Sequence, residues 1–195
     1  MTQDPAPTLH IGAFSGSGRP DGWGARVLAA AGEASPERLE LVELPVHLPH
    51  YDAEADRDES PAEVASLRSA VNGLDGLIIV SPEFNHSVPG VLKNALDWLS
   101  RPAYRSPLRD LPVTAIAFSP GPVGGARGLG QLRAVLTGTA SALLPWPDLA
   151  VGNVAEKFDG DRLVDETVER RLAAQLEAFS HWVDAVSTYR AAMHA

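Results

Sequence analysis

The chain of 195 residues, 45% of them hydrophobic, suits one α/β domain with a substantial core, and we expect a single domain over residues 1–195. Its net charge of -9 disfavours nucleic acid or an anionic membrane as partners, and no apolar run approaches the roughly 20 residues of a membrane-spanning helix. The absence of cysteine excludes disulfides and thiolate chemistry, so redox chemistry would need a bound cofactor. Residues 1–8 lack an export signal and are expected to be a flexible lead-in, with a cytoplasmic location as the default.

The first elements along the chain are a short apolar strand at 9–14, a loop rich in glycine and serine, and a helix from about residue 25 to 34. Unpaired backbone N–H groups and the helix dipole make such a junction suitable for an anion such as a phosphate. A flexible connection is an equally good interpretation of the glycines alone. The residues of interest in this loop are Ser15, Ser17, Arg19, Gly22, Trp23 and Gly24.

Two further strands and a helix are predicted in the next part of the chain. A strand at 39–44 precedes an acidic, irregular segment, 48–60, which we interpret as a solvated surface loop. Ser60 and Glu63 have the spacing of a capping box and predict the start of a helix with an apolar stripe. The apolar, β-branched run 77–80 is typical of a buried parallel strand.

The second half of the chain continues the alternation of strands and helices. After a polar loop, the apolar residues of 89–99 recur at helical spacing and predict an amphipathic helix. A strand at 113–118 leads into a loop of glycine and proline, 119–127, and then into another helix. A short strand at 142–144 and a long amphipathic helix with apolar residues from 168 to 186 follow.

This alternation predicts an α/β fold with a doubly wound, five-stranded parallel sheet between two layers of helices. In the strand order 2-1-3-4-5, as in flavodoxin, the first, third and fourth strands are neighbours. Their loops would therefore converge on the carboxyl edge of the sheet, where open α/β sheets bind ligands. The sequence thus predicts one binding site built from three loops.

The stretch 81–98, Ser-Pro-Glu-Phe-Asn-His-Ser-Val-Pro-Gly-Val-Leu-Lys-Asn-Ala-Leu-Asp-Trp, resembles the signature loop and helix of the NAD(P)H-dependent FMN reductases. This family includes azo-, quinone- and chromate-reducing flavoenzymes. The run from Ser119 to Ala126 is similar to the family's next loop, and the run from Gly16 to Arg19 to its phosphate loop. The resemblance covers roughly residues 9–144 and implies a flavodoxin-like three-layer sandwich.

The resemblance implies that the loop after the third strand holds the isoalloxazine ring, mostly through backbone groups, with Phe84 against the flavin. The ring-binding residues would be Pro82, Glu83, Phe84 and Asn85, with Ser119, Pro120, Gly121 and Gly124 at the other edge of the ring. Ser17 and Arg19 would bind the 5′-phosphate together with backbone amides, and the rest of the first loop, Ser15, Gly22, Trp23 and Gly24, would complete the cofactor site. The family commonly has serine and asparagine where this chain has Gly22 and Gly24.

The function implied by the resemblance is transfer of hydride from NADPH or NADH to FMN and on to a small acceptor: free flavin, a quinone, an azo compound or a metal ion. The cofactor carries this chemistry while the protein orients the reactants, so we name no catalytic residue. The histidines lack metal-ligand spacing, and we predict no metal site. Two alternatives are a flavodoxin-like binding or regulatory module with weakened or lost flavin binding, and a flavodoxin-type electron carrier.

Several side chains allow two interpretations. Lys93 and Asp97 are either a surface ion pair or part of a homo-oligomer contact, in a dimer or tetramer, through helix 89–99, to which Trp98 and Leu99 could contribute. His86 is either a substrate contact or a solvated loop residue, and Glu83 either an acid/base or a structural residue of the loop. Trp146 and Trp182 are interpreted as core or interface residues.

Overall fold

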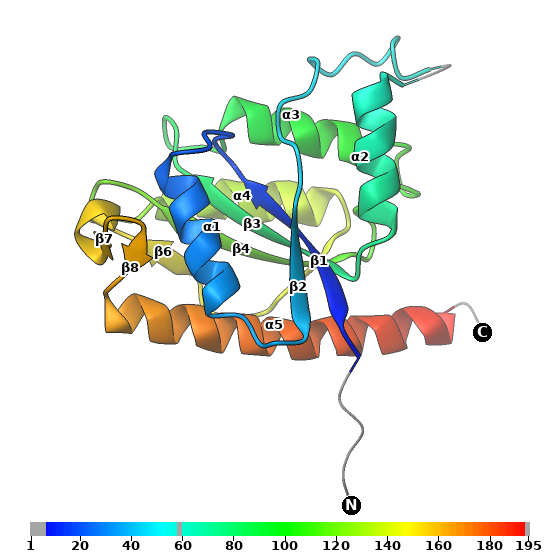
Figure 1. The fold of residues 1–195 in the computed structure, drawn as a ribbon. Helices are drawn as coiled ribbons and strands as arrows, with labels where there is room; N and C mark the ends of the chain where they lie inside the picture. The colour runs from blue at the N-terminus through cyan, green and yellow to red at the C-terminus, as the bar shows by residue number, and fades with distance from the viewer. Residues whose placement is uncertain (1–6, 58–59, 194–195) are drawn as a thin grey trace, which may run out of the picture.

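A parallel sheet forms the centre of the computed structural model, which describes residues 7–57 and 60–193 (Figure 1). The expected lead-in, residues 1–8, lies outside the described residues except for positions 7 and 8. The strands are β1 (Leu9–Ser15), β2 (Leu39–Glu43), β3 (Gly76–Pro82), β4 (Pro112–Phe118) and β5 (Ala142–Leu143). Their order is β2-β1-β3-β4-β5, all pairs being parallel, which confirms the predicted arrangement.

The fifth position in the sheet is shared by two short strands. β5 pairs with the beginning of β4, whereas β6 (Leu149–Val151) pairs with its last three residues, Ile116–Phe118. The prolines at 145 and 147 separate the two strands, because proline cannot donate to a ladder. The sheet therefore has six strands, and the sequence analysis missed β6 because three residues are too few to show a period.

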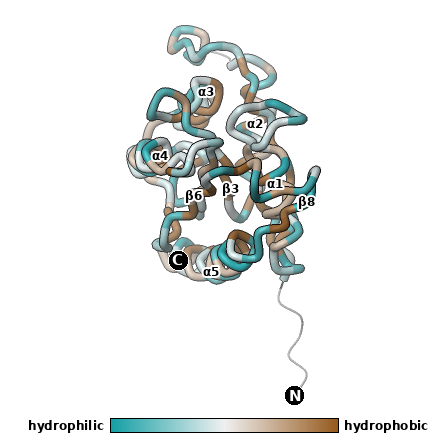
Figure 2. The backbone as a smooth tube through the Cα atoms, turned by 90° about the vertical axis from the view of Figure 1, so that its left-hand side faces the viewer, coloured by the Kyte–Doolittle hydropathy of each residue, from teal (hydrophilic) through white to brown (hydrophobic). Residues whose placement is uncertain are grey.

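Helices cover both faces of the sheet and confirm the predicted three layers. They are α1 (Trp23–Glu33), α2 (Ala62–Asn72), α3 (Gly90–Leu99), α4 (Ala126–Gly138) and α5 (Glu166–Met193). One hydrophobic core contains α1 and α5, and a second contains α2, α3 and α4. Figure 2 shows α3 and α4 on one side of β3 and α5 on the other.

The central strand explains why two cores form. All seven residues of β3 are buried, and successive side chains point to opposite faces. Ile78 and Val80 belong to the core beneath α1 and α5, while Leu77 and Ile79 belong to the core beneath α2, α3 and α4. The continuous apolar run predicted from the sequence is thus the consequence of burial on both faces.

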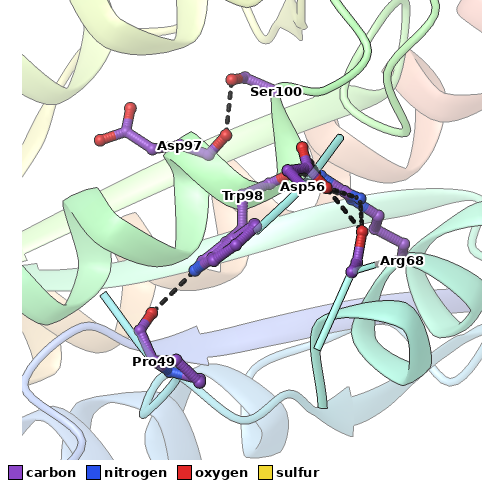
Figure 3. A network of polar contacts seen from close by, with 7 residues as sticks. Pro49, Asp56, Arg68, Asp97, Trp98 and Ser100 are labelled. Carbon is purple, nitrogen blue, oxygen red and sulfur yellow. Dashed lines mark hydrogen bonds and ion pairs between the residues drawn. The ribbon is translucent and has the colours of Figure 1, made fainter. Parts of the chain in front are cut away.

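The segment between β2 and α2 is anchored to two helices, although we expected a solvated loop (Figure 3). The indole Nε1 of Trp98 donates to the carbonyl of Pro49 at 2.8 Å. Arg68 of α2 donates to both carboxylate oxygens of Asp56, at 2.7 and 2.9 Å, and to the carbonyl of Trp98. The residues from 52 to 55 are exposed, but their flanks are held against α3 and α2.

The predicted capping box at the start of α2 is wrong. The hydroxyl of Ser60 donates to Asp56 at 2.6 Å, and Pro61 occupies the N-cap position of the helix. In a capping box the serine hydroxyl would accept a backbone N–H, whereas here the Ser60 hydroxyl donates to Asp56 and accepts from Arg68. Glu63 remains in the first turn, where a negative charge suits the helix dipole.

A 3-10 turn (Val154–Lys157) and a small antiparallel hairpin, β7 (Phe158–Asp159) and β8 (Arg162–Leu163), connect β6 to α5. The sequence analysis did not foresee this hairpin, whose strands have two residues each. Within the described part of the chain, no helix is long and apolar enough to cross a membrane.

Candidate functional site

Three loops meet at the carboxyl edge of the sheet and enclose a cleft of about 360 Å³. Nine of the fourteen residues predicted for the site line this cleft, and they come from the ends of β1, β3 and β4. They are Ser17, Arg19, Gly22, Trp23, Pro82, Glu83, Phe84, Ser119 and Pro120. The remaining five, Ser15, Gly24, Asn85, Gly121 and Gly124, belong to the same loops or their ends but do not line the cleft. Asp21, Arg26 and Phe118 also line the cleft and were missed.

The loop after β1 is folded into two consecutive turns. The N–H of Gly18 donates to the carbonyl of Ser15 at 3.0 Å, and the N–H of Gly22 donates to the carbonyl of Arg19 at 3.1 Å. Gly18 has a φ of 62°, which glycine adopts without steric cost. These turns bring the chain to the N-terminus of α1, where free backbone N–H groups favour an anion.

Buried hydroxyls lie next to this helix N-terminus. Ser15 is 5% exposed, and its Oγ has no hydrogen-bond partner among the described residues. A Cβ at Gly24 would lie 2.7 Å from Ser15 Oγ and 3.4 Å from Ser17 Oγ, so the absence of a side chain lets both hydroxyls approach. Because buried polar atoms are normally hydrogen-bonded, the unpartnered Ser15 hydroxyl is a spare donor for a polar ligand at this end of the sheet.

Gly22 also has a local reason to lack a side chain. A Cβ at this position would come within 3.0 Å of the Cβ of Arg19, the cation of the same loop. The two glycines therefore leave space that Ser15, Ser17 and Arg19 use. The residues of this loop fit a phosphate group by a set of donors different from the serine and asparagine that the family commonly has at the positions of Gly22 and Gly24.

The loop after β3 contains a tight two-residue turn. Phe84 and Ser87 exchange both backbone hydrogen bonds at 3.0 Å, and the two residues between them have positive φ angles, 50° for Asn85 and 63° for His86. Positive φ at both central positions is the geometry of a type I′ hairpin turn. The turn leaves Phe84 on the cleft wall with 52% of its surface exposed, and it places Asn85 and His86 at the tip, away from the lining.

Glu83 ties this loop to the start of α4. Its Oε2 accepts a hydrogen bond from the N–H of Gly128 at 2.9 Å, and its Oε1 lies 3.1 Å from His86 Nδ1 and 3.8 Å from Arg127. The hydrogen bond from Gly128, followed by those from His86 and Arg127, holds the pKa of the Glu83 carboxyl below its usual value. A depressed pKa makes Glu83 a poor proton donor at neutral pH, so its geometry fits the structural role.

The loop after β4 is held by β6. The N–H of Ser119 donates to the carbonyl of Val151, and the N–H of Asn153 donates to the carbonyl of Gly121, both at 3.0 Å. Gly124 has a φ of 69°, and a Cβ there would come within 2.7 Å of the Ala150 carbonyl carbon. Gly121 and Gly124 therefore pack the loop onto β6, which presents Ser119 and Pro120 to the cleft.

The missed residue Arg26 lies at the end of the first turn of α1. Its guanidinium lies 4.7 Å from the ring centroid of Trp23, and its Nε forms an ion pair with Asp161 at 2.8 Å. A cation so close to the N-terminus of a helix is unusual, because the helix dipole favours anions there. This unfavourable position of a cation is the feature of the sequence that could have identified Arg26 as a site residue.

The suggestion that Trp98 and Leu99 contribute to an interface is wrong. Both side chains have 0% exposure within the single chain, because α3 buries them against the sheet and the anchored segment. Lys93 and Asp97 do form the expected pair, with Nζ and Oδ1 2.6 Å apart and both side chains partly exposed. Trp146 is 42% exposed, while the indole of Trp182 donates to the Ala142 carbonyl at 2.8 Å.

Known proteins share both this sequence and this fold. The family model of NADPH-dependent FMN reductases matches residues 9–156. The chain is 34% identical over 183 residues to the quinone reductase of Escherichia coli strain K12, covering 91% of this chain and 97% of that protein. It is 30% identical over 177 residues to the 2-hydroxy-1,4-benzoquinone reductase of a Burkholderia species, covering 90% and 96%.

A similar solved structure is that of FerB, a flavoenzyme NAD(P)H:(acceptor) oxidoreductase from Paracoccus denitrificans. The TM-score is 0.82 at 27% sequence identity, and the match covers 92% of this chain and 98% of FerB. The family model spans all three loops of the cleft, and the Escherichia coli relative is covered almost from end to end. The chain therefore belongs to the NADPH-dependent FMN reductase family of oxidoreductases, which use FMN together with NAD(P)H.

Proposed function

We propose that this reductase holds FMN in the cleft and passes electrons from NAD(P)H to a quinone. The observation that carries the assignment of the cleft is the buried, unpartnered hydroxyl of Ser15 beside the N-terminus of α1. A phosphate at that position would accept hydrogen bonds from this hydroxyl and from free backbone N–H groups. The relatives from Escherichia coli and Burkholderia are both quinone reductases, which supports a quinone as the acceptor.

The lining residues divide into a phosphate end and a ring end. Ser17 and Arg19 of the lining would bind the phosphate, with the Ser15 hydroxyl behind them as a further donor. Backbone groups of residues 82–85 and 119–124 would hold the isoalloxazine ring, as the resemblance implies. Bound FMN supplies the electron-transfer chemistry, and the chain supplies orientation and electrostatics.

The mouth of the cleft suits a planar acceptor. Phe84 is half-exposed there, and the turn from Phe84 to Ser87 holds its backbone in place. An exposed aromatic ring offers a stacking surface for nicotinamide or a quinone. Neither substrate requires an acid or base from the lining, in agreement with the depressed pKa of Glu83.

The test uses flavin absorbance. The purified protein, supplied with FMN, should be yellow. Its flavin absorbance, at roughly 450 nm, should disappear when NADPH or NADH is added without oxygen, and should return when benzoquinone is added. A protein that is colourless after mixing with FMN and removal of the unbound flavin would refute flavin binding. A yellow protein that responds only to a partner reductase, and never to a nicotinamide, would instead be an electron carrier.

We also infer that copies of this chain associate, as a dimer or tetramer, through the exposed face of α3. Lys93 and Asp97 lie one turn apart on that face, and such a pair is self-complementary about a two-fold axis. Replacing Asp97 by Lys would place like charges at the contact. Light scattering should then show a smaller particle for Asp97→Lys than for the unchanged chain, and an unchanged monomer in both would refute the contact.

A further inference from the structure

The hairpin formed by β7 and β8 lies against the phosphate end of the cleft. Figures 1 and 2 both show β8 beside α1. Two contacts join them: the rings of Trp23 and Phe158 lie 5.7 Å apart, and Arg26 Nε lies 2.8 Å from Asp161 Oδ1. The hairpin begins at Phe158, beyond the segment 9–156 matched by the family model.

Two guanidinium groups lie at this end of the cleft. Arg19 and Arg26 both line it, next to the positive N-terminus of α1. Asp21 lines it as well, and Asp161 balances part of the charge, but its side chain is 87% exposed and its interaction is screened by water. In a chain with a net charge of -9, such a grouping favours an anionic ligand.

The geometry of Arg26 leaves donors for that ligand. The ion pair with Asp161 engages Nε, and the Trp23 ring supports the guanidinium plane at 4.7 Å. A guanidinium carries further N–H groups on Nη1 and Nη2, in a fork that matches two oxygens of a phosphate. Arg26 can therefore donate into the cleft without leaving Asp161.

The hydroxyl on which the proposed function rests also lies close to Arg26. Ser15 Oγ is buried, has no partner among the described residues, and lies beside Gly24 in the same turn of α1 as Arg26. Gly22 and Gly24 have no side-chain donors, so other groups must donate hydrogen bonds to the phosphate oxygens. Arg26 is the additional cation that lines the cleft there.

We propose that Arg26 is a second guanidinium ligand of the flavin phosphate, beside Arg19, and that Asp161 of the hairpin positions it. The inference rests on the proposed function, since it takes FMN to be the ligand of the cleft. Its consequence is selectivity: Arg26 contributes to binding of FMN, a phosphate monoester, and contributes nothing to binding of riboflavin, which lacks the phosphate. The hairpin thereby becomes part of the cofactor site without touching the flavin ring.

The experiment compares FMN and riboflavin on the same variants. Flavin-free protein is titrated with each flavin, and binding is followed by the quenching of flavin fluorescence. Arg26→Ala should raise the Kd for FMN about tenfold, equivalent to about 1.4 kcal/mol, and should leave the Kd for riboflavin within about twofold. Arg26→Lys keeps the charge without the planar fork and should give an intermediate Kd for FMN.

Two controls separate a direct contact from other effects. Arg162→Ala removes an arginine charge from the neighbouring hairpin, at an exposed position outside the cleft, and should leave both Kd values unchanged. Asp161→Asn should weaken FMN binding less than Arg26→Ala, and should add nothing in the Arg26→Ala background, because Asp161 acts through Arg26. Thermal unfolding of each variant identifies any that has lost its fold, and Arg26→Lys then carries the test.

The possible failures are distinguishable. If the unchanged protein binds neither flavin, the proposed function fails and the inference fails with it. If the unchanged protein binds FMN but Arg26→Ala binds it equally well, only the inference is overturned. Equal losses for FMN and riboflavin in Arg26→Ala, or an equal loss of FMN in Arg162→Ala, would also overturn it, because neither result is specific to a phosphate contact.

Discussion

Arg19 is the exposed cation in the loop after β1, and the turn closed by Gly22 holds its backbone at the mouth of the cleft. Because it lies where the phosphate is proposed, Arg19→Ala should weaken FMN binding by about tenfold, the size of one lost charge-assisted hydrogen bond. Equilibrium titration measures the Kd. Arg109→Ala, at an exposed position that does not line the cleft, is the matched control. Equal affinities in the two variants would remove Arg19 from the phosphate site.

Glu83 shows how one residue can organise a site without taking part in its chemistry. Its carboxylate accepts the hydrogen bond from Gly128, and this bond is the main cause of its lowered pKa. A lowered pKa in the folded state means that the carboxylate stabilises the fold above the pKa of the unfolded chain. This contribution is lost as the pH falls through the lower, folded-state pKa.

Glu83→Gln should therefore reduce the free energy of unfolding by about 1 kcal/mol at pH 7, because a neutral amide is a weaker acceptor. As the pH falls below about 4.3, the ordinary pKa of glutamate, the difference from the unchanged protein should shrink. Urea unfolding at several pH values measures both effects. If the difference in the free energy of unfolding stays constant down to roughly pH 3, the charge of Glu83 has no role in stability.

At the scale of elements, two of the three glycines of α4, Gly128 and Gly130, have opposite surroundings. A Cβ at Gly128 would lie 3.2 Å from the Cα, Cβ and Cγ of Glu83, whereas a Cβ at Gly130 would meet nothing within 4 Å. Gly128 thus allows the loop after β3 to approach the helix, and Gly130 is open to solvent. The two positions share one helix, so they separate helix propensity from close packing.

Gly130→Ala should raise the free energy of unfolding by about 0.5–1 kcal/mol, because alanine is the better helix former. Gly128→Ala should lack this gain, because its methyl group pushes the backbone of Glu83 away, and it should also weaken FMN binding. Denaturant unfolding and FMN titration of both variants test the pair. If Gly128→Ala is as stable as Gly130→Ala and binds FMN normally, the close packing at Glu83 is unimportant.

At the scale of the whole molecule, the segment between β2 and α2 joins the sheet edge to two helices through Asp56 and Arg68. Both side chains are largely buried, with 11% and 17% exposure. The hydrogen bond from Arg68 is the main cause of the lowered pKa of Asp56, with Ser60 contributing. Its stabilising effect is therefore present above the unfolded-state pKa of aspartate and is lost at lower pH.

Asp56→Asn should lower the free energy of unfolding by about 1–2 kcal/mol at pH 7, because it leaves a largely buried guanidinium without its charged partner. The loss should diminish as the pH falls below about 3.9, where the unfolded chain takes up protons. Glu54→Gln breaks an exposed ion pair in the same segment and should have no measurable effect. Equal effects of the two substitutions would show that the segment is not anchored through Asp56.

Local patterns in the sequence predicted the alternation of strands and helices, and therefore the three layers, while the strand order and the convergence of three loops followed from the likeness to the flavodoxin fold. Strand β3 is an apolar run because both of its faces are buried, and the glycines and prolines after β1, β3 and β4 stop the strands at one edge. These features depend on residues that are neighbours in the chain. Nine cleft residues could therefore be predicted, together with the family that they resemble.

Only the tertiary structure decided which residues from distant parts of the chain touch. The pairing of Arg26 with Asp161, of Glu83 with Gly128, and of the Ser119 loop with β6 each joins segments far apart in sequence. Isolated polar residues such as these do not produce a hydrophobic periodicity in the sequence, because each is placed by a single contact and not by a repeated burial pattern. For the same reason the buried Trp98, the docked segment before α2 and the hairpin beside α1 became evident only in the folded chain.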